Sequence, residues 1–282
     1  MGPFGKGMRL AFGWIDGSNR LSRTARIPLG GVPEGWPHPR KWELAYVLAR
    51  FHGDEFNEPR PPITDEQRRR KERSEARLRS EGVPTLAWLP LIESEDELEP
   101  RRAEEVADRL RALTAVAAKA DAQDQGRPPV QVLEMMKRSM HGPIPAALFT
   151  PDELDFVRDF HTAEKDPAQF VWRYEAAWVL LWALRWIEAP LSMPSEFCDL
   201  ELLRDIVRSE PDLTVRGLRP LAELLDEADL IYRYHWASRS ALNQGLEPPA
   251  GLSQDVIVER HHALNWLIRF ENAEWDELRC GT

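Results

Sequence analysis

Apolar residues recur every three or four positions through most of the chain beyond residue 64, and this spacing predicts amphipathic helices. The pattern is clear from residue 99 onward and returns over about 200–209, 221–243 and 253–270. Thr64 with Gln67 and Thr150 with Glu153 have the spacing of capping boxes, which begin helices. We therefore expect a mostly α-helical bundle over residues 64–282.

The segment 172–188 differs from the other helical stretches because its apolar side chains cover nearly the whole circumference. Such a helix has to be surrounded by others. Its uncharged part is too short to span a bilayer, so we interpret it as the Trp-rich central helix of the bundle.

Residues 1–63 follow another pattern. Apolar and polar positions alternate from Met8 to Trp14, and turn-forming residues follow at 16–19, so a small β-hairpin over 8–27 is one interpretation. Glycine and proline are frequent over 30–39, and a short helical pattern occupies 42–51. We expect an N-terminal extension over 1–63 that is irregular or partly β, followed by a helical domain over 64–282.

Composition narrows the class of partner. The chain has 282 residues, a net charge of −10 and a pI near 5.3, which argue against a surface-wide affinity for nucleic acid or an anionic membrane. The basic stretch 60–79 contains interleaved acids and no aromatic residues, so a solvated or partner-binding helix is favoured over a nucleic-acid contact. Nucleic acid is therefore an unlikely partner, and we expect no membrane span.

The number and spacing of the cysteines indicate in which cellular compartment the protein is expected. Two cysteines, Cys198 and Cys280, are too few for a disulfide framework and lack the spacing of a zinc or redox motif. The N-terminus shows no apolar stretch typical of a signal peptide. We therefore expect a cytoplasmic protein.

Five polar residues occupy positions where the helical stripes call for apolar ones: Glu175, His235, Arg239, Glu259 and Arg260. They comprise two acids, two arginines and one histidine. The favoured interpretation is a charge-balanced structural network, because buried arginine and carboxylate groups commonly pair. In the alternative, Arg239 and Arg260 hold an anionic ligand while Glu175 or His235 moves a proton. Of the five, His235 is expected to change charge near neutral pH.

Other chemistry finds less support in the sequence. Glu259 and His262 have the Glu-x-x-His spacing of di-iron bundles, but no second copy is found, and His262 turns away from the apolar arc. The acidic run 223–229 is interpreted as a solvated helix face. No nucleophile elbow, phosphate loop or dinucleotide fingerprint is present. We therefore predict no metal and no cofactor.

Four segments together resemble one protein family: Arg102–Leu110, Trp172–Trp182, Leu225–Trp236 and Glu259–Trp266. The chain from about Arg68 to its end is similar to the bacterial domain-of-unknown-function family 4272. The resemblance implies a mostly helical domain and supplies no catalytic residues. We expect a soluble, non-enzymatic binding or interaction protein that recognises an unknown protein or a small anionic ligand. A small-molecule enzyme, such as a hydrolase, is the alternative.

Overall fold

The computed structural model describes residues 11–15, 21–26, 62–128, 131, 144–158, 168–278 and 280. The chain divides into two units, Met1–Pro62 and Ile63–Thr282. In the first unit, strands β1 (Ala11–Ile15) and β2 (Leu21–Arg26) pair antiparallel, with Ala11 opposite Arg26. Residues 16–20, where the expected turn falls, lie outside the described residues, and so does the helical pattern at 42–51. The complete hairpin over 8–27 therefore stays a prediction.

The second unit is helical, and its described residues contain no strand, which confirms the mostly-α prediction. Its α-helices are α2 (Asp65–Ser80), α3 (Ala103–Asp124), α5 (Pro151–Arg158), α6 (Ala168–Val171), α7 (Arg173–Ala183), α8 (Leu200–Ser209), α9 (Leu221–Leu242) and α10 (Gln254–Leu267). Short 3₁₀ helices lie between or after them: η2 (Glu95–Glu97), η3 (Ala146–Leu148), η4 (Pro249–Gly251) and η5 (Phe270–Asn272).

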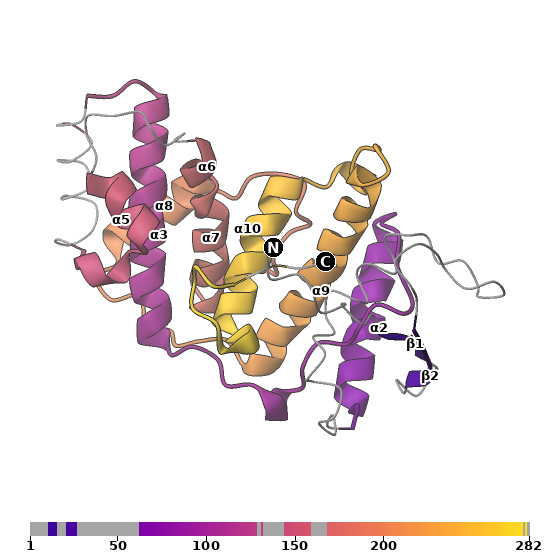
Figure 1. Ribbon diagram of the computed structural model, residues 1–282. Helices are drawn as coiled ribbons and strands as arrows, with labels where there is room; N and C mark the ends of the chain where they lie inside the picture. The colour runs from indigo at the N-terminus through magenta and orange to yellow at the C-terminus, as the bar shows by residue number, and fades with distance from the viewer. Residues whose placement is uncertain are drawn as a thin grey trace, which may run out of the picture. The chain divides into compact units, whose positions relative to one another are not determined.

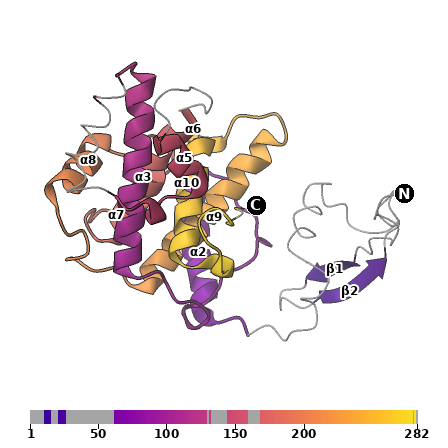
Figure 2. The same ribbon diagram turned by 60° about the vertical axis from the view of Figure 1, so that its left-hand side comes forward.

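The long helices of this unit lie side by side in the order α3, α7, α10, α9, α2, as Figures 1 and 2 show. Helices α5 and α6 pack against α3, and α8 packs against α7. Every residue from Tyr174 to Ala183 is buried, because α7 has neighbours on several sides. Across the described residues, no helix combines the length and the apolar character needed to cross a bilayer.

Helix starts follow the expected caps. The Thr64 hydroxyl accepts from the Gln67 backbone N–H at 3.2 Å, and the Gln67 side chain accepts from the Thr64 N–H at 2.9 Å. Glu153 and Thr150 repeat this reciprocal arrangement at the start of α5. The further start expected at 166–167 lies outside the described residues. Both capping boxes are therefore confirmed.

The central helix is shorter than the predicted 172–188, because α7 ends at Ala183. Arg185 adopts a left-handed conformation, with φ of 64°. Its N–H donates to the Trp182 carbonyl at 2.9 Å, and the Trp186 N–H donates to the Leu181 carbonyl at 3.2 Å. This is a Schellman ending, in which glycine is the usual residue. An arginine there gives no sequence signal for the end of the helix.

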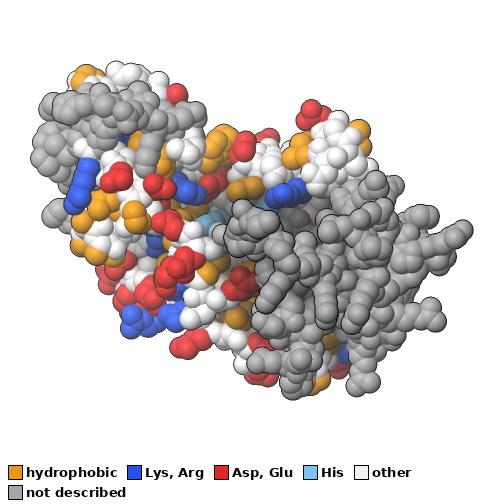
Figure 3. All heavy atoms as spheres, viewed as in Figure 1, with side chains coloured by type: hydrophobic (Ala, Val, Ile, Leu, Met, Phe, Trp, Pro, Cys, Tyr) orange, Lys and Arg blue, Asp and Glu red, His pale blue; other side chains and the backbone are white. Residues whose placement is uncertain are grey.

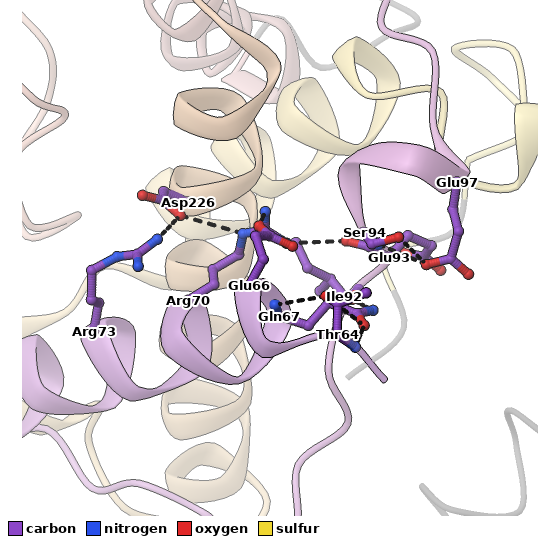
Figure 4. A network of polar contacts seen from close by, with 10 residues as sticks. All are labelled: Thr64, Glu66, Gln67, Arg70, Arg73, Ile92, Glu93, Ser94, Glu97 and Asp226. Atoms are coloured by element: carbon purple, nitrogen blue, oxygen red, sulfur yellow. Dashed lines mark hydrogen bonds and ion pairs between the residues drawn. The ribbon is translucent and has the colours of Figure 1, made fainter. Parts of the chain in front are cut away.

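The charged side chains of helix α2 form polar contacts with other parts of the fold (Figure 4). Its buried stripe consists of Gln67, Arg70, Ser74 and Leu78, so three of its four members are polar. Arg70 Nε and Arg73 Nη2 reach Asp226 Oδ1 on α9 at 3.3 and 2.5 Å. Gln67 donates to the Ile92 carbonyl at 2.8 Å. These contacts explain how a helix of almost wholly charged sequence packs against α9.

Candidate functional site

Glu175 and Arg260 form a buried pair between α7 and α10. Arg260 Nε donates to Glu175 Oε2 at 2.8 Å, and the Cys198 backbone N–H donates to Oε1 at 2.6 Å. Arg260 Nη1 donates to the Ser192 carbonyl at 2.9 Å. The relative exposures of Glu175 and Arg260 are 0% and 1%. Pairing therefore offsets the cost of an isolated buried carboxylate, and it connects the segment 192–198 to two helices.

Glu259 does not pair with either of the arginines proposed for it. Both its carboxylate oxygens accept from Arg173 Nη1, at 2.8 and 2.9 Å. Burial raises the pKa of Glu259, and the neighbouring Arg173 opposes that rise. Arg173 stands at the start of α7, and the sequence pattern did not single it out as a partner for Glu259.

Arg239 corrects the prediction of a core arginine, because it is exposed. It lies in the last turn of α9, close to Leu242, whose side chain is 44% exposed. The end of α9 is thus open to solvent, and a long arginine side chain there can keep its charge in water. The expected balance of two acids with two arginines is met by Arg173 and Arg260 instead.

His235 belongs to a different polar chain. Its Nδ1 lies 2.7 Å from Nδ1 of His261, and the Gln254 amide nitrogen lies 3.2 Å from its Nε2. Ser238 Oγ donates to Gln254 Oε1 at 2.6 Å. Because an amide nitrogen only donates, we assign His235 Nε2 as an acceptor and Nδ1–H as the donor to His261.

Burial, aided by the charge of Arg239, lowers the pKa of His235 to about 4. The ring is therefore neutral at pH 7. This corrects the expectation that His235 titrates near neutral pH, because desolvation shifts its proton affinity well below the usual range for histidine.

Arg260 also lines a small hollow. Its volume is about 10 Å³, which is room for about one water molecule, and it is partly open to solvent. We call it the Arg260 hollow, and it is lined by Leu191, Ser192, Pro194, Glu227, Leu230, Ile231, Tyr234, Arg260 and Leu264. Arg260 Nη2 is buried and has no hydrogen-bond partner among the described residues. A buried cationic donor without a partner is costly, so this atom marks a place where an acceptor would be favoured.

Glu227 is the second charged residue of the Arg260 hollow, although the acidic run 223–229 had been interpreted as a solvated helix face. One of its oxygens lies 4.0 Å from Arg77 Nη1 on α2. Arg77 Nε donates to Glu81 Oε1 at 3.1 Å, and the Tyr234 hydroxyl donates to the other oxygen of Glu81. Burial raises the pKa of Glu227 to about 7, although Arg77 opposes the rise. A carboxyl group that titrates near pH 7 is able to give or take a proton there.

The sequence did not bring together a second, largely buried cluster, which we call the Trp275 cluster: Arg109, Glu153, His262 and Trp275. Arg109 bonds to the two oxygens of Glu153 at 2.8 and 2.6 Å. The Arg109 guanidinium carbon lies 4.0 Å from the Trp275 ring centroid, and the His262 ring lies 4.6 Å from the same ring. Burial lowers the pKa of His262 to about 4. His262 is thus half-buried, with its ring packed against Trp275 of the C-terminal segment.

The sequence held only a partial signal for this cluster. Glu153 was recognised as the capping-box residue of α5, a role that it keeps while also bonding Arg109. Arg109 is a charged residue outside the apolar pattern of its helix, yet it is only 6% exposed. Within the described ranges, no three His, Cys, Asp or Glu side chains are grouped as a metal site would need.

Acidic and basic side chains are intermixed on the face drawn in Figure 3, without a broad field of one sign over the coloured residues. The described fold and site together define a helical domain built around buried ion pairs, with a small polar hollow beside one of them. No curated protein and no solved structure matches the chain. Over residues 70–278 the chain matches the family described as Domain of unknown function (DUF4272). The chain belongs to this family, which confirms the resemblance found in the sequence.

Proposed function

We propose that the helical domain is a non-enzymatic binding protein, and that the Arg260 hollow, which has room for about one water molecule, widens to receive a small ligand. The observation that carries this proposal is that Arg260, a lining residue of the hollow, has a buried Nη2 with no hydrogen-bond partner among the described residues. The two other nitrogens of the same guanidinium group are held by Glu175 and the Ser192 carbonyl. The orientation of the third is thus fixed before any ligand arrives, which lowers the entropic cost of binding.

The lining of the hollow supports binding. Aliphatic side chains form most of its wall, and only a few polar groups interrupt them, as in other small-molecule sites. Ser192 lines the hollow and is exposed, so a ligand can enter beside it.

A filling variant tests this proposal. Ile231→Phe places a larger ring in the hollow without removing any of its polar groups, and Val258→Phe makes a comparable addition at an exposed position of α10. A library of small carboxylates, amides and amines is screened by ligand-observed NMR. We expect a compound that binds the wild type and Val258→Phe but not Ile231→Phe. Equal binding to all three proteins, or no binding to the wild type, contradicts the proposal.

Leu230→Phe provides a second filling variant if Ile231→Phe fails to fold, since Leu230 lines the same hollow. Circular dichroism melting of each variant checks that lost binding does not reflect lost structure. A folded Leu230→Phe protein that still binds the compound also contradicts the proposed site.

A small-molecule enzyme is the second candidate, and Glu227 is the observation that favours it. Its pKa of about 7 suits a general acid or base. His235, the earlier candidate for this role, is neutral and contacts His261 and Gln254. Chemical conversion of a bound compound, lost in Glu227→Gln while binding persists, would assign the protein to this class. Binding without conversion supports the first candidate.

We further propose a bacterial, cytoplasmic setting. Family resemblance suggests the first part of this proposal, and the two free cysteines support the second. Fractionation of a native host with an antibody against the chain tests both parts, and recovery from an oxidising compartment contradicts the second.

A further inference from the structure

The residues that follow α10 turn back to contact α10 and α3, and these contacts indicate a moving part. We infer that residues 273–278 form a strap that opens about a hinge at residues 269–272 while the helices stay folded. Arg101 is the clasp that holds the strap closed, and opening uncovers the Trp275 cluster. This inference goes beyond the proposed function and does not depend on the Arg260 hollow.

Trp275 anchors the closed strap. Its ring centroid lies 5.5 Å from the Trp266 ring and 4.6 Å from the His262 ring, both on α10. The guanidinium carbon of Arg109 on α3 lies 4.0 Å from the same ring. Leu278 is the second buried side chain of the strap, and the other four are half-buried or exposed. A segment with so few buried side chains is able to open without unfolding the whole domain.

The hinge is strained in the closed state. Three of its four residues have left-handed backbone conformations, with φ of 54° at Arg269, 55° at Glu271 and 51° at Asn272. This region is unfavourable for residues with a Cβ atom, and asparagine tolerates it better than arginine or glutamate. An open strap lets Arg269 and Glu271 return to ordinary conformations, so opening relieves the strain.

Closure also buries polar atoms that lack partners. Nε1 of Trp275, Nε of Arg269 and Nε2 of His262 are buried and have no hydrogen-bond partner among the described residues. A buried polar atom without a partner is costly, and water satisfies it when it becomes accessible. The unpaired atoms and the strained hinge therefore both favour the open state.

Arg101, which lies just before α3 and is 6% exposed, opposes these costs. Its Nε donates to the Trp266 carbonyl at 3.4 Å, before the hinge, and its Nη2 donates to the Ala273 carbonyl at 2.9 Å, after the hinge. Its Nη1 donates to Glu274 Oε1 at 3.2 Å. One guanidinium group thus joins both ends of the hinge, and a hydrogen bond to the Glu274 carboxylate is stronger than one between neutral groups.

Hydrogen–deuterium exchange of the full chain, followed by mass spectrometry, tests the strap. Peptides that cover 273–278 should exchange about a hundredfold faster than peptides that cover 256–267, because strap opening exposes far less surface than unfolding. Equal rates would mean that the strap opens only with the whole domain. Exchange of 273–278 at the rate of an unstructured peptide would mean that nothing holds it closed. Either result overturns the inference.

Arg101→Ala tests the clasp. It should speed the exchange of 273–278 by about tenfold, since three hydrogen bonds are lost, and should change that of 256–267 by less than about twofold. Arg102→Ala, at the adjacent position whose side chain is 75% exposed, is the control and should leave both rates unchanged. An equal acceleration of both segments in Arg101→Ala would show a general structural role and overturn the assignment. If Arg101→Ala does not fold, Arg101→Lys tests the same point, because lysine keeps the charge without the planar fork of donors.

Glu271→Gly and Glu271→Ala test the hinge. Glu271 is exposed, so both variants remove the same side chain, but only glycine adopts the positive φ freely. Relief of strain in the closed state should slow the exchange of 273–278 by about fivefold in Glu271→Gly. Glu271→Ala should stay within about twofold of wild type. Equal exchange of the strap in the two variants would overturn the strained hinge, whatever the outcome for Arg101.

Discussion

Arg109 and Arg260 are both buried arginines paired with a glutamate on a neighbouring helix, but they use their guanidinium groups differently. Arg109 gives both terminal nitrogens to Glu153 and lies over the Trp275 ring. Arg260 bonds to Glu175 through Nε alone, and its Nη2 has no hydrogen-bond partner among the described residues. The first pair is enclosed by C-terminal residues, whereas the second borders a space that is partly open to solvent.

This difference separates a structural pair from a candidate binding site. A bidentate pair uses both terminal nitrogens of an arginine, which best match a carboxylate, and so leaves fewer donors for a ligand. A contact through Nε orients the group and keeps one terminal nitrogen available. The burial of a charged residue therefore says little about its role until the partners of each nitrogen are known.

Arg109→Ala should produce the largest effect. It leaves the carboxylate of Glu153, which is 1% exposed, without its cation, and it removes the stacking on Trp275. We expect the free energy of unfolding to fall by about 4 kcal/mol in urea titrations. Arg111→Ala on the same helix is the control, since Arg111 is more exposed and should cost under about 1 kcal/mol. Similar losses in the two variants would remove the structural role assigned to Arg109.

Arg260→Ala should cost somewhat less, about 3 kcal/mol, because the Cys198 N–H still donates to Glu175. Arg239→Ala is the matched control on the neighbouring helix, and its change should stay within about 0.5 kcal/mol because Arg239 is exposed. Urea titration again gives both values. A larger loss for Arg239→Ala than for Arg260→Ala would restore the original assignment of Arg239 to the core network.

The Trp275 cluster should weaken in acid. The folded-state pKa of His262, about 4, lies below the ordinary value of 6.5, so its contribution to stability is complete above about pH 6.5 and is lost as pH falls through 4. His235 adds a loss of the same sign. His262→Phe keeps a ring against Trp275 and should remove about 2 kcal/mol of this acid dependence. Urea midpoints measured across this pH range test it, and a profile identical to wild type would contradict it.

The Arg260 hollow should show the opposite and smaller dependence. The pKa of Glu227 is raised from 4.5 to about 7, so its stabilising contribution is complete below about pH 4.5 and is lost as pH rises through 7. Glu227→Gln should therefore gain about 1 kcal/mol relative to wild type at high pH, a figure reduced for the 14% exposure of the side chain. Thermal melts at matched ionic strength measure it. Destabilisation of Glu227→Gln at high pH would exclude a protonated Glu227 in the ligand-free fold.

Local patterns predicted the helices well, because their signals lie within a few residues. Capping at Thr64 and Thr150 depends on side chains three positions apart, and both caps form as expected. The end of α7 could not be predicted, since Arg185 takes a conformation that glycine normally occupies. Stripes of mixed polarity were harder still: α2 buries Arg70 and Gln67, which a hydrophobic pattern assigns to solvent.

The candidate site was predicted in part for a related reason. Periodicity places a residue on a face of its own helix, and it correctly buried Glu175, His235, Glu259 and Arg260. The choice of partner depends on how helices pack, which no single-helix pattern contains. Glu259 therefore turned out to pair with Arg173, and the hollow beside Arg260 involves Glu227, whose acidic run looked solvated.

The backbone N–H of Cys198 has a consequence beyond packing. It donates at 2.6 Å to the Glu175 carboxylate on α7, which also accepts from Arg260 on α10. Both helices therefore shield this amide proton from solvent. Such an amide exchanges with solvent deuterium only when those helices separate. Its exchange rate would thus report how often α7 and α10 separate beside Arg260.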